Sequence, residues 1–461
     1  MLEIAIFLLL CFLAGYLLKK YKKGESYFYL ITLLRSKKYL WILDKLKFLP
    51  MEFIADLGII SGFGMLGVIY LLKQNAKMHK LMKAAVFCIS AFILYFIISA
   101  LISSVSSPLL KSKGIIGFLH GSFVIMGFAG FSITTLILQA IEIISKYLTG
   151  VRPCPGIAPV VPGVSLPNVP ITLPFYAWIP LFLILVIHEL SHGIIARKFN
   201  VSMKSVGILL FGFLPLGAFV EPDDEDMKKL PKLNNARIYA TGPIANFIVF
   251  ILAALFFSLI LQPAIVPQMK HLREIAVEGI FIESVTKETE FCGETFQNSA
   301  YGILKPGMQI LMVNNKPIKT LFDFMSAAQK DPNKIELTYR DLNGVIHTRT
   351  FKKNKMGLIG IAVKEKQKKN FNYSFMQYLQ LVFLFLLSGI MHWFIWLNLV
   401  VAIVNFLPIV PFDGFGISRI ILPELLAFTK LPLKTREDII VKFFTGFLIL
   451  LFAINIIPLF I

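Results

Sequence analysis

The feature that most constrains this chain is a succession of apolar runs long enough to cross a lipid bilayer. A membrane-spanning helix needs about 20 consecutive, mostly apolar residues. Eight runs approach or exceed that length, at residues 2–18, 57–72, 84–107, 115–145, 181–196, 237–262, 377–407 and 441–461. We therefore expect a polytopic α-helical membrane protein with about eight transmembrane helices.

Composition agrees with this interpretation. Hydrophobic residues make up 56% of the 461 positions and charged residues only 16%, against roughly 25% charged residues in soluble domains. The mean hydropathy is +0.74. The net charge of +19 fits the basic cytoplasmic loops and anionic-lipid contacts of a membrane protein. We therefore exclude nucleic acid as a partner and expect the lipid bilayer instead.

The position of basic residues predicts the orientation of the first run. Four lysines at 19, 20, 22 and 23 follow residues 2–18, which is not the order of a secretory signal peptide. This order places the N-terminus outside the cell and the lysines in the cytoplasm. Residues 26–49 suit an amphipathic helix on the inner membrane surface, and an ordinary basic loop fits equally well. If 57–72 were re-entrant, the N-terminus would lie inside.

Residues 267–370 interrupt the apolar pattern. Their hydrophobicity drops and short alternating stretches predict strands. The segment from Asn298 to Gly307 (NSAYGILKPG), followed by Asn314 to Ile318 (NNKPI), resembles a PDZ domain, although Met308 replaces the usual acidic residue. We expect an inserted PDZ-like α+β domain, which the predicted topology places outside the cell.

The four cysteines form no disulfide framework, and no CxxC motif occurs. Cys11 and Cys88 lie in apolar runs. Cys154, in a proline-rich connector over 152–180, and Cys292 could meet outside the membrane, where disulfides persist. Whether these two pair stays open from the sequence alone.

The fifth run contains the chemistry, because His188-Glu189-Leu190-Ser191-His192 is an HExxH pentad. Histidines four residues apart lie on one helix face and can chelate one zinc ion. Glu189 can accept a proton from a water whose pKa the metal lowers towards 7. Ionisable groups in an apolar span are costly without a partner. The alternative is that the HExxH pattern arose by chance. Because His and Glu are infrequent in this chain, a chance match is rare.

A hydrolytic zinc takes three protein ligands and keeps a fourth position open. Asp413 is the obvious third candidate, because it closes the segment Asn405 to Gly414 (NFLPIVPFDG). Two prolines there interrupt a helix and free the backbone to bring a carboxylate inward. The alternative is a helix-terminal Asp413 at the membrane interface. Two imidazoles and one carboxylate favour one Zn²⁺ per chain.

HELSH followed by Asn405-x-x-Pro408-x-x-x-x-Asp413-Gly414 resembles the site-2 protease family of intramembrane zinc metalloproteases, peptidase family M50. The resemblance includes Gly242 to Asn246 (GPIAN) and residues 207–222, which are similar to the hairpin that these proteins insert beside the active site. It covers about 150–415. The extra N-terminal spans make the chain more similar to the larger, PDZ-containing branch.

The resemblance implies regulated proteolysis of the transmembrane segments of membrane-anchored proteins. It implies Glu189 as the catalytic residue and His188, His192 and Asp413 as the metal ligands. It also implies substrate-positioning roles for Asn405, Asn246 and Gly212. Because backbone groups in a membrane helix are already hydrogen-bonded, the substrate must unwind before cleavage, and the hairpin could hold it by edge pairing.

These features divide the chain into four parts. Residues 1–150 are N-terminal transmembrane helices with an interfacial basic segment, and 151–266 are the first half of the metalloprotease core. Residues 267–370 are the extracytoplasmic PDZ-like domain, and 371–461 are the second half of the core. His192 precedes Lys198 by six residues, about 9 Å along a helix, so we expect the active site near the cytoplasmic side.

A zinc transporter or a non-proteolytic metal-binding scaffold is the rival hypothesis. His120 and His392 also lie in apolar runs, and buried histidines there are usually packed or hydrogen-bonded. A transporter should show internal repeats, and none is evident. It does not need Glu189. An inactive family member acting as a chaperone is disfavoured because both motifs are intact.

Overall fold

A computed structural model describes residues 2–21, 25–38, 40–74, 113–159, 161–166, 169, 171–212 and 214–460. Within these ranges, six helices are long and apolar enough to cross a membrane. Six of the eight predicted runs fall in them. The run at 84–107 lies outside the described residues. The run at 2–18 forms α1 (Leu2–Lys20), which is not one of the six, so a total of eight spans stays a prediction.

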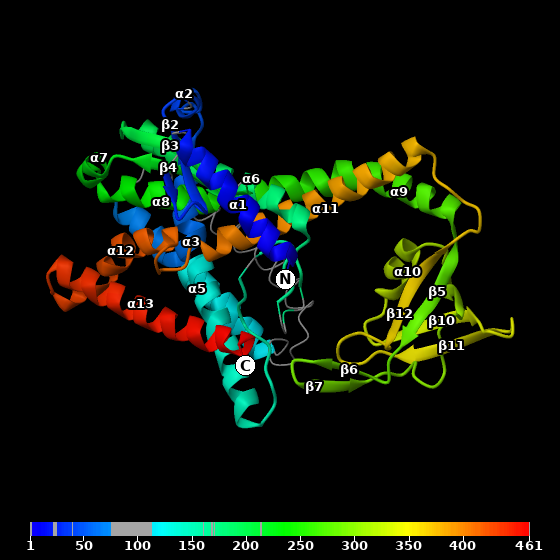
Figure 1. Cartoon of the computed structure of the whole chain (residues 1–461). Helices are drawn as coiled ribbons and strands as arrows, with labels where there is room; N and C mark the ends of the chain where they lie inside the picture. The colour runs from blue at the N-terminus through cyan, green and yellow to red at the C-terminus, as the bar shows by residue number, and fades with distance from the viewer. Residues whose placement is uncertain are drawn as a thin grey trace.

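The six helices form the body of the protein (Figure 1). They are α3 (Met51–Lys73), α5 (Lys113–Leu148), α6 (Trp178–Lys198), α8 (Lys232–Phe256), α11 (Phe375–Val404) and α13 (Leu433–Ile456). A π-helical turn at Phe257–Leu261 joins α8 to α9 (Gln262–Ala276). The joined helix has 45 residues and is therefore about 67 Å long, far more than the roughly 30 Å of a bilayer core.

The bundle core brings together helices from distant parts of the sequence. Phe63 of α3 and Phe128 of α5 are almost fully buried. The ring of Phe128 packs 5.1 Å from Phe247 of α8 and 5.9 Å from Phe406, which follows α11. α3 bends at Gly64 and α5 at Gly127, both with positive φ. A Cβ on Gly64 would lie 2.6 Å from the Gly127 nitrogen, so glycine at both bends lets the helices touch.

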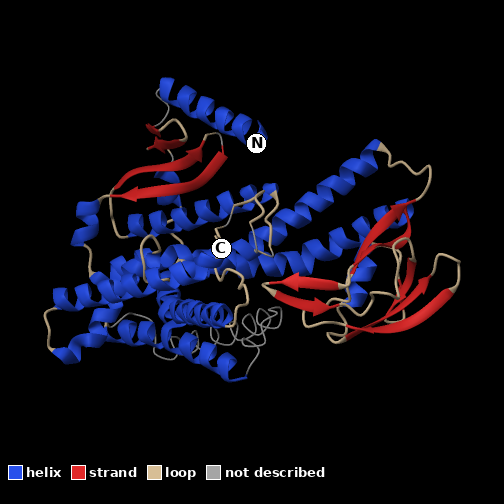
Figure 2. Cartoon of the chain, turned by 60° about the horizontal axis from the view of Figure 1, so that its bottom comes forward, coloured by secondary structure: helices blue, strands red, loops and turns tan. Residues whose placement is uncertain are grey.

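A four-stranded antiparallel sheet lies beside the bundle, between it and α1 (Figure 2). Its strands, in spatial order, are β1 (Glu25–Tyr27), β2 (Ile31–Ser36), β3 (Met203–Phe211) and β4 (Leu214–Pro222). β3 and β4 form the predicted hairpin. α7 (Asp224–Lys229) follows it.

The predicted amphipathic helix over 26–49 is wrong. Among the described residues of this range, only α2 (Leu40–Lys45) is helical, and β2 pairs along its whole length with β3. The reason is tertiary: the exposed edge of the β3–β4 hairpin needs a partner. Residues 31–36 (ITLLRS) supply one, with the Thr32 side chain fully buried.

Besides the four-stranded sheet, the protein has an α+β region, which lies at the ends of α9 and α11 that point away from the helical body (Figures 1 and 2). Its main sheet has the order β11-β10-β8-β5-β12, with β9 added to β8 and a separate β6–β7 hairpin. The elements are β5 (Val277–Val285), β6 (Glu288–Phe291), β7 (Glu294–Gln297), β8 (Gln309–Val313), β9 (Lys316–Pro317), α10 (Leu321–Ala328), β10 (Lys334–Arg340), β11 (Ile346–Lys352) and β12 (Ile361–Gln367). It has its own core around Ile280, Ile310 and Leu337. The sheet begins later than the predicted boundary at 267 because α9 extends to Ala276.

Cys154 and Cys292 form a disulfide, which answers the question that the sequence left open. It joins the β6–β7 hairpin to the segment that follows α5. The ammonium group of Lys146 lies 2.9 Å from the Glu294 carboxylate in the same place. The α+β region is thus attached to the helical body at this hairpin as well as through α9 and α11.

Candidate active site

α6 presents both predicted histidines on one face. It begins after the proline-rich connector and ends with Arg197 and Lys198, basic residues that suit a helix C-terminus. His188 is buried and His192 partly buried. Their rings are 4.9 Å apart, and their Nε2 atoms are separated by 3.2 Å.

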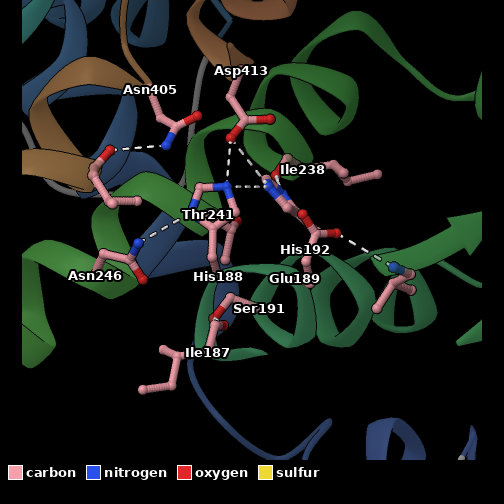
Figure 3. Close-up of polar contacts among 12 residues, drawn as sticks. Ile187, His188, Glu189, Ser191, His192, Ile238, Thr241, Asn246, Asn405 and Asp413 are labelled. Atoms are coloured by element: carbon pink, nitrogen blue, oxygen red, sulfur yellow. Dashed lines mark hydrogen bonds and ion pairs between the residues drawn. The ribbon is translucent and has the colours of Figure 1, made fainter. Parts of the chain in front are cut away.

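Asp413 completes the cluster from a distant part of the chain (Figure 3). It is the first residue of α12 (Asp413–Leu425), where a carboxylate is favourable for the helix dipole. Its Oδ2 lies 2.9 Å from His188 Nε2 and 3.2 Å from His192 Nε2. The loop before it is closed by the Gly414 N–H, which donates to the Asn405 carbonyl at 2.7 Å. The structure thus brings His188, His192 and Asp413 together, with ligand atoms within 4.8 Å of one another.

The second ring nitrogen of each histidine has its own partner on α8. His192 Nδ1 donates to the Ile238 carbonyl at 2.7 Å. His188 Nδ1 lies 3.2 Å from the side-chain amide of Asn246. The Asn246 Oδ1 is buried without a partner among the described residues, so the amide turned by 180° would accept the Nδ1–H. Partners of this kind fix which nitrogen a histidine offers to a metal, and here both offer Nε2.

Gly242 leaves the space in front of the two imidazoles open. A Cβ at this position would lie 2.4 Å from His192 Nε2 and 2.7 Å from His188 Nε2. A tetrahedral zinc with Zn–N bonds of about 2.0–2.1 Å holds two ligand atoms about 3.3 Å apart. The observed separation of 3.2 Å between the Nε2 atoms is close to that value. The donor set, its spacing and the glycine therefore fit a zinc ion.

Glu189 lies next to the cluster and faces the hairpin. Its Oε2 accepts the Val220 N–H of β4 at 3.3 Å (Figure 3). This contact aligns the edge of β4 with the carboxylate. A carboxylate and the edge of β4 that is not paired with β3 thus lie side by side.

The three predicted positioning residues have different surroundings. Asn246 contacts His188 as described. The Asn405 side-chain nitrogen donates to the Val401 carbonyl at 2.9 Å, and the residue lies beside Asp413 in Figure 3. Gly212 is in the hairpin turn with φ of +59°, whereas Val220 lies six residues, or about 20 Å, along β4 from its first residue Leu214. The structure does not bring Gly212 to the cluster, and its substrate role stays a prediction.

Sequence reasoning missed the backbone groups that organise the site. The Ile238 carbonyl and the Val220 N–H carry no residue-type signal, because every non-proline residue has both groups. Only the fold reveals which of them face His192 and Glu189.

Comparison with known proteins agrees with this geometry. The family model of peptidase family M50 matches residues 176–453, more than half of the chain. The chain belongs to peptidase family M50. Members of this family are zinc metalloproteases, and the six apolar helices support an integral membrane protein. The chain is also 29% identical over 295 residues to an uncharacterized protein of Methanocaldococcus jannaschii, in an alignment covering 63% of this chain and 68% of that protein.

Proposed function

We propose that this M50 protein is an intramembrane zinc metalloendopeptidase of the site-2 protease type, which cuts transmembrane segments of membrane-anchored proteins. The observation that carries the proposal is the convergence of His188 and His192, inside the apolar helix α6, with Asp413 at the start of α12. Such ionisable groups are costly in a membrane unless they serve a function. Glu189 beside them is what a peptidase needs and a zinc transporter does not.

Each residue of the site has a role in this proposal. His188, His192 and Asp413 would hold one Zn²⁺, which would supply Lewis-acid polarisation of a carbonyl oxygen and a lowered pKa of water. Glu189 accepts the proton of the attacking water and returns it to the leaving nitrogen. Asn246 and the Ile238 carbonyl keep the two imidazoles in the orientation that offers Nε2.

β4 gives the substrate a place to bind in an extended form. Alternate residues of a strand direct their N–H groups to the same side. Because the Val220 N–H points to Glu189 and away from β3, the backbone groups of Ala218 lie on the same free edge. An unwound substrate segment that pairs with this edge runs past the Glu189 carboxylate. The Asn405 amide lies on the side of this substrate segment that faces Asp413.

The α+β region acts as a PDZ-like domain on the outer side of the membrane. The Cys154–Cys292 disulfide supports this side, since disulfides persist in oxidising compartments outside the cytoplasm. Arg197 and Lys198 at the other end of α6 support a cytoplasmic location for that end. This domain is attached to the helical body through the β6–β7 hairpin and through α9 and α11. In this position it admits to the active site only those substrates whose outer segments are short.

Cleavage of two matched membrane substrates tests the proposal. One carries Gly and Asn in its transmembrane segment, and the other has an uninterrupted Leu helix. Both are reconstituted in liposomes with the purified protein, and the products are mapped by mass spectrometry. We expect cuts within the first segment only, abolished by a chelator and restored by zinc. Cuts confined to residues outside the bilayer, or cleavage that resists the chelator, would contradict the proposal.

A further inference from the structure

α3 lies outside the segment that matches the peptidase family, which begins at residue 176. Nevertheless it touches both halves of the candidate site. A Cβ on Gly58 would lie 2.5 Å from the Ala240 carbonyl oxygen of α8. A Cβ on Gly62 would collide with the ring of Phe406, the residue after Asn405. α3 therefore packs directly against the backbone that carries Ile238 and against the start of the Asp413 loop.

A buried ion pair fixes α3 to α8 at this contact. The guanidinium of Arg237 donates through Nε and Nη2 to the two carboxylate oxygens of Asp56, at 2.8 and 2.9 Å. Both residues are over nine-tenths buried, with 4% of Asp56 and 8% of Arg237 exposed. A bidentate pair of this kind sets orientation as well as distance. Glu52 also accepts from Arg237, at 3.3 Å, but its side chain is 47% exposed.

The ion pair is one residue away from a group that orients the site. Arg237 precedes Ile238, whose carbonyl accepts the His192 Nδ1–H at 2.7 Å. The Arg237 carbonyl in turn accepts the hydroxyl of Thr241, one residue before Gly242. The segment 237–242 therefore carries, in order, the anchored guanidinium, the histidine partner and the glycine that faces both imidazoles.

We propose that the Asp56–Arg237 ion pair is a positioning device of the metal centre, which holds the Ile238 carbonyl against His192 and makes α3 part of the catalytic core. Asp56 and Arg237 act through this carbonyl and touch neither substrate nor metal. The inference rests on the proposed zinc site but not on proteolysis. A membrane ion pair that only held helices together would have no need to lie beside the partner of a ligand.

Zinc affinity and cobalt spectroscopy of Asp56→Asn test the inference, with Glu52→Gln as the matched control. Both variants remove one negative charge next to Arg237, but only the first removes the buried bidentate partner. We expect the zinc dissociation constant of Asp56→Asn, measured by chelator competition, to rise about tenfold, since groups that orient metal ligands affect affinity by about 10- to 100-fold. The absorption bands of the cobalt-substituted protein should shift, and kcat should fall with KM unchanged. Glu52→Gln should match the unmodified protein in all of these.

Arg237→Lys provides a second test, because it keeps the charge and loses the planar fork. If Asp56→Asn does not fold, Arg237→Lys decides whether the ion pair orients the metal site. We expect the absorption bands of cobalt-substituted Arg237→Lys to shift as in Asp56→Asn. A folded Asp56→Asn, or failing that Arg237→Lys, with unchanged zinc affinity and cobalt bands would overturn the inference, even if its melting temperature fell. If the unmodified protein binds zinc but cuts neither liposome substrate, the proposed function fails while these metal readouts still decide the role of Asp56.

Discussion

The candidate metal site and the α+β region are built in opposite ways. The centre draws on α3, α6, α8 and α12, which are separated by up to hundreds of residues, and backbone atoms such as the Ile238 carbonyl hold it in place. The α+β region folds from one continuous segment around its own core. Its two ends meet, since the Lys368 N–H donates to the Ala276 carbonyl at 2.9 Å. We therefore expect that the α+β region can be removed as a unit, whereas small changes in the helical body reach the candidate site.

The largest effect is expected from Gly242→Ala, which adds a single methyl group in front of both imidazoles. The Cβ would lie 2.4 Å from His192 Nε2, where neither a metal nor the histidine can remain in place. We expect zinc affinity to fall by about 100-fold and cleavage to be lost. Gly446→Ala in α13 is the control, because a Cβ there meets nothing within 4 Å. Zinc binding that survives Gly242→Ala at full strength would contradict the geometry of the site.

Deletion of the α+β region tests the other side of the comparison. Residues 277–367 are removed, Ala276 is joined to Lys368 by a short Gly-Ser linker, and Cys154 is replaced by Ser. We expect the zinc dissociation constant to stay within about twofold, the scale of coupling between distant sites. Selectivity should change, which cleavage of a full-length substrate and of one with a trimmed outer segment would measure. The same preference for the trimmed substrate in both enzymes would refute the access role of this region.

The smallest effect is expected at the periphery of the helical body. The Arg197 guanidinium donates to Asp44 at 3.0–3.1 Å and lowers the pKa of that carboxyl from 3.8 to about 2. A lowered carboxyl pKa stabilises the folded state above the unfolded value and loses this effect as pH falls from about 4 to about 2. Because the Asp44–Arg197 pair is exposed, we expect Asp44→Asn to lower the free energy of unfolding by about 0.5 kcal/mol or less. Thermal unfolding at pH 7 and pH 3 measures the stability difference between the unmodified protein and Asp44→Asn. This difference should be smaller at pH 3, and a larger difference at pH 3 would contradict the stabilising role of the Asp44–Arg197 pair.

The same contrast explains what the sequence could and could not predict. The clustering of His188, His192 and Asp413 was predictable because a metal site requires particular side chains at particular spacings. Most apolar runs were predictable because a bilayer imposes their length. β2 was not, because a six-residue strand gains its stability from β3, which lies far away in the sequence. The contacts of the Ile238 carbonyl and of Asp56 were hidden for a similar reason. The packing of α8 on α6 brings the Ile238 carbonyl to His192, and the packing of α3 on α8 brings Asp56 to Arg237.

The measurement that tests the central claim most directly is zinc content and cleavage in Glu189→Gln, compared with His188→Ala. The account predicts that Glu189→Gln retains about one zinc per chain and loses cleavage, since it removes the proton acceptor but no ligand. His188→Ala should lose both. Zinc would be counted by elemental analysis of the purified proteins, and cleavage by mass spectrometry with the liposome substrate. Full cleavage by Glu189→Gln, or full zinc content in His188→Ala, would contradict the account.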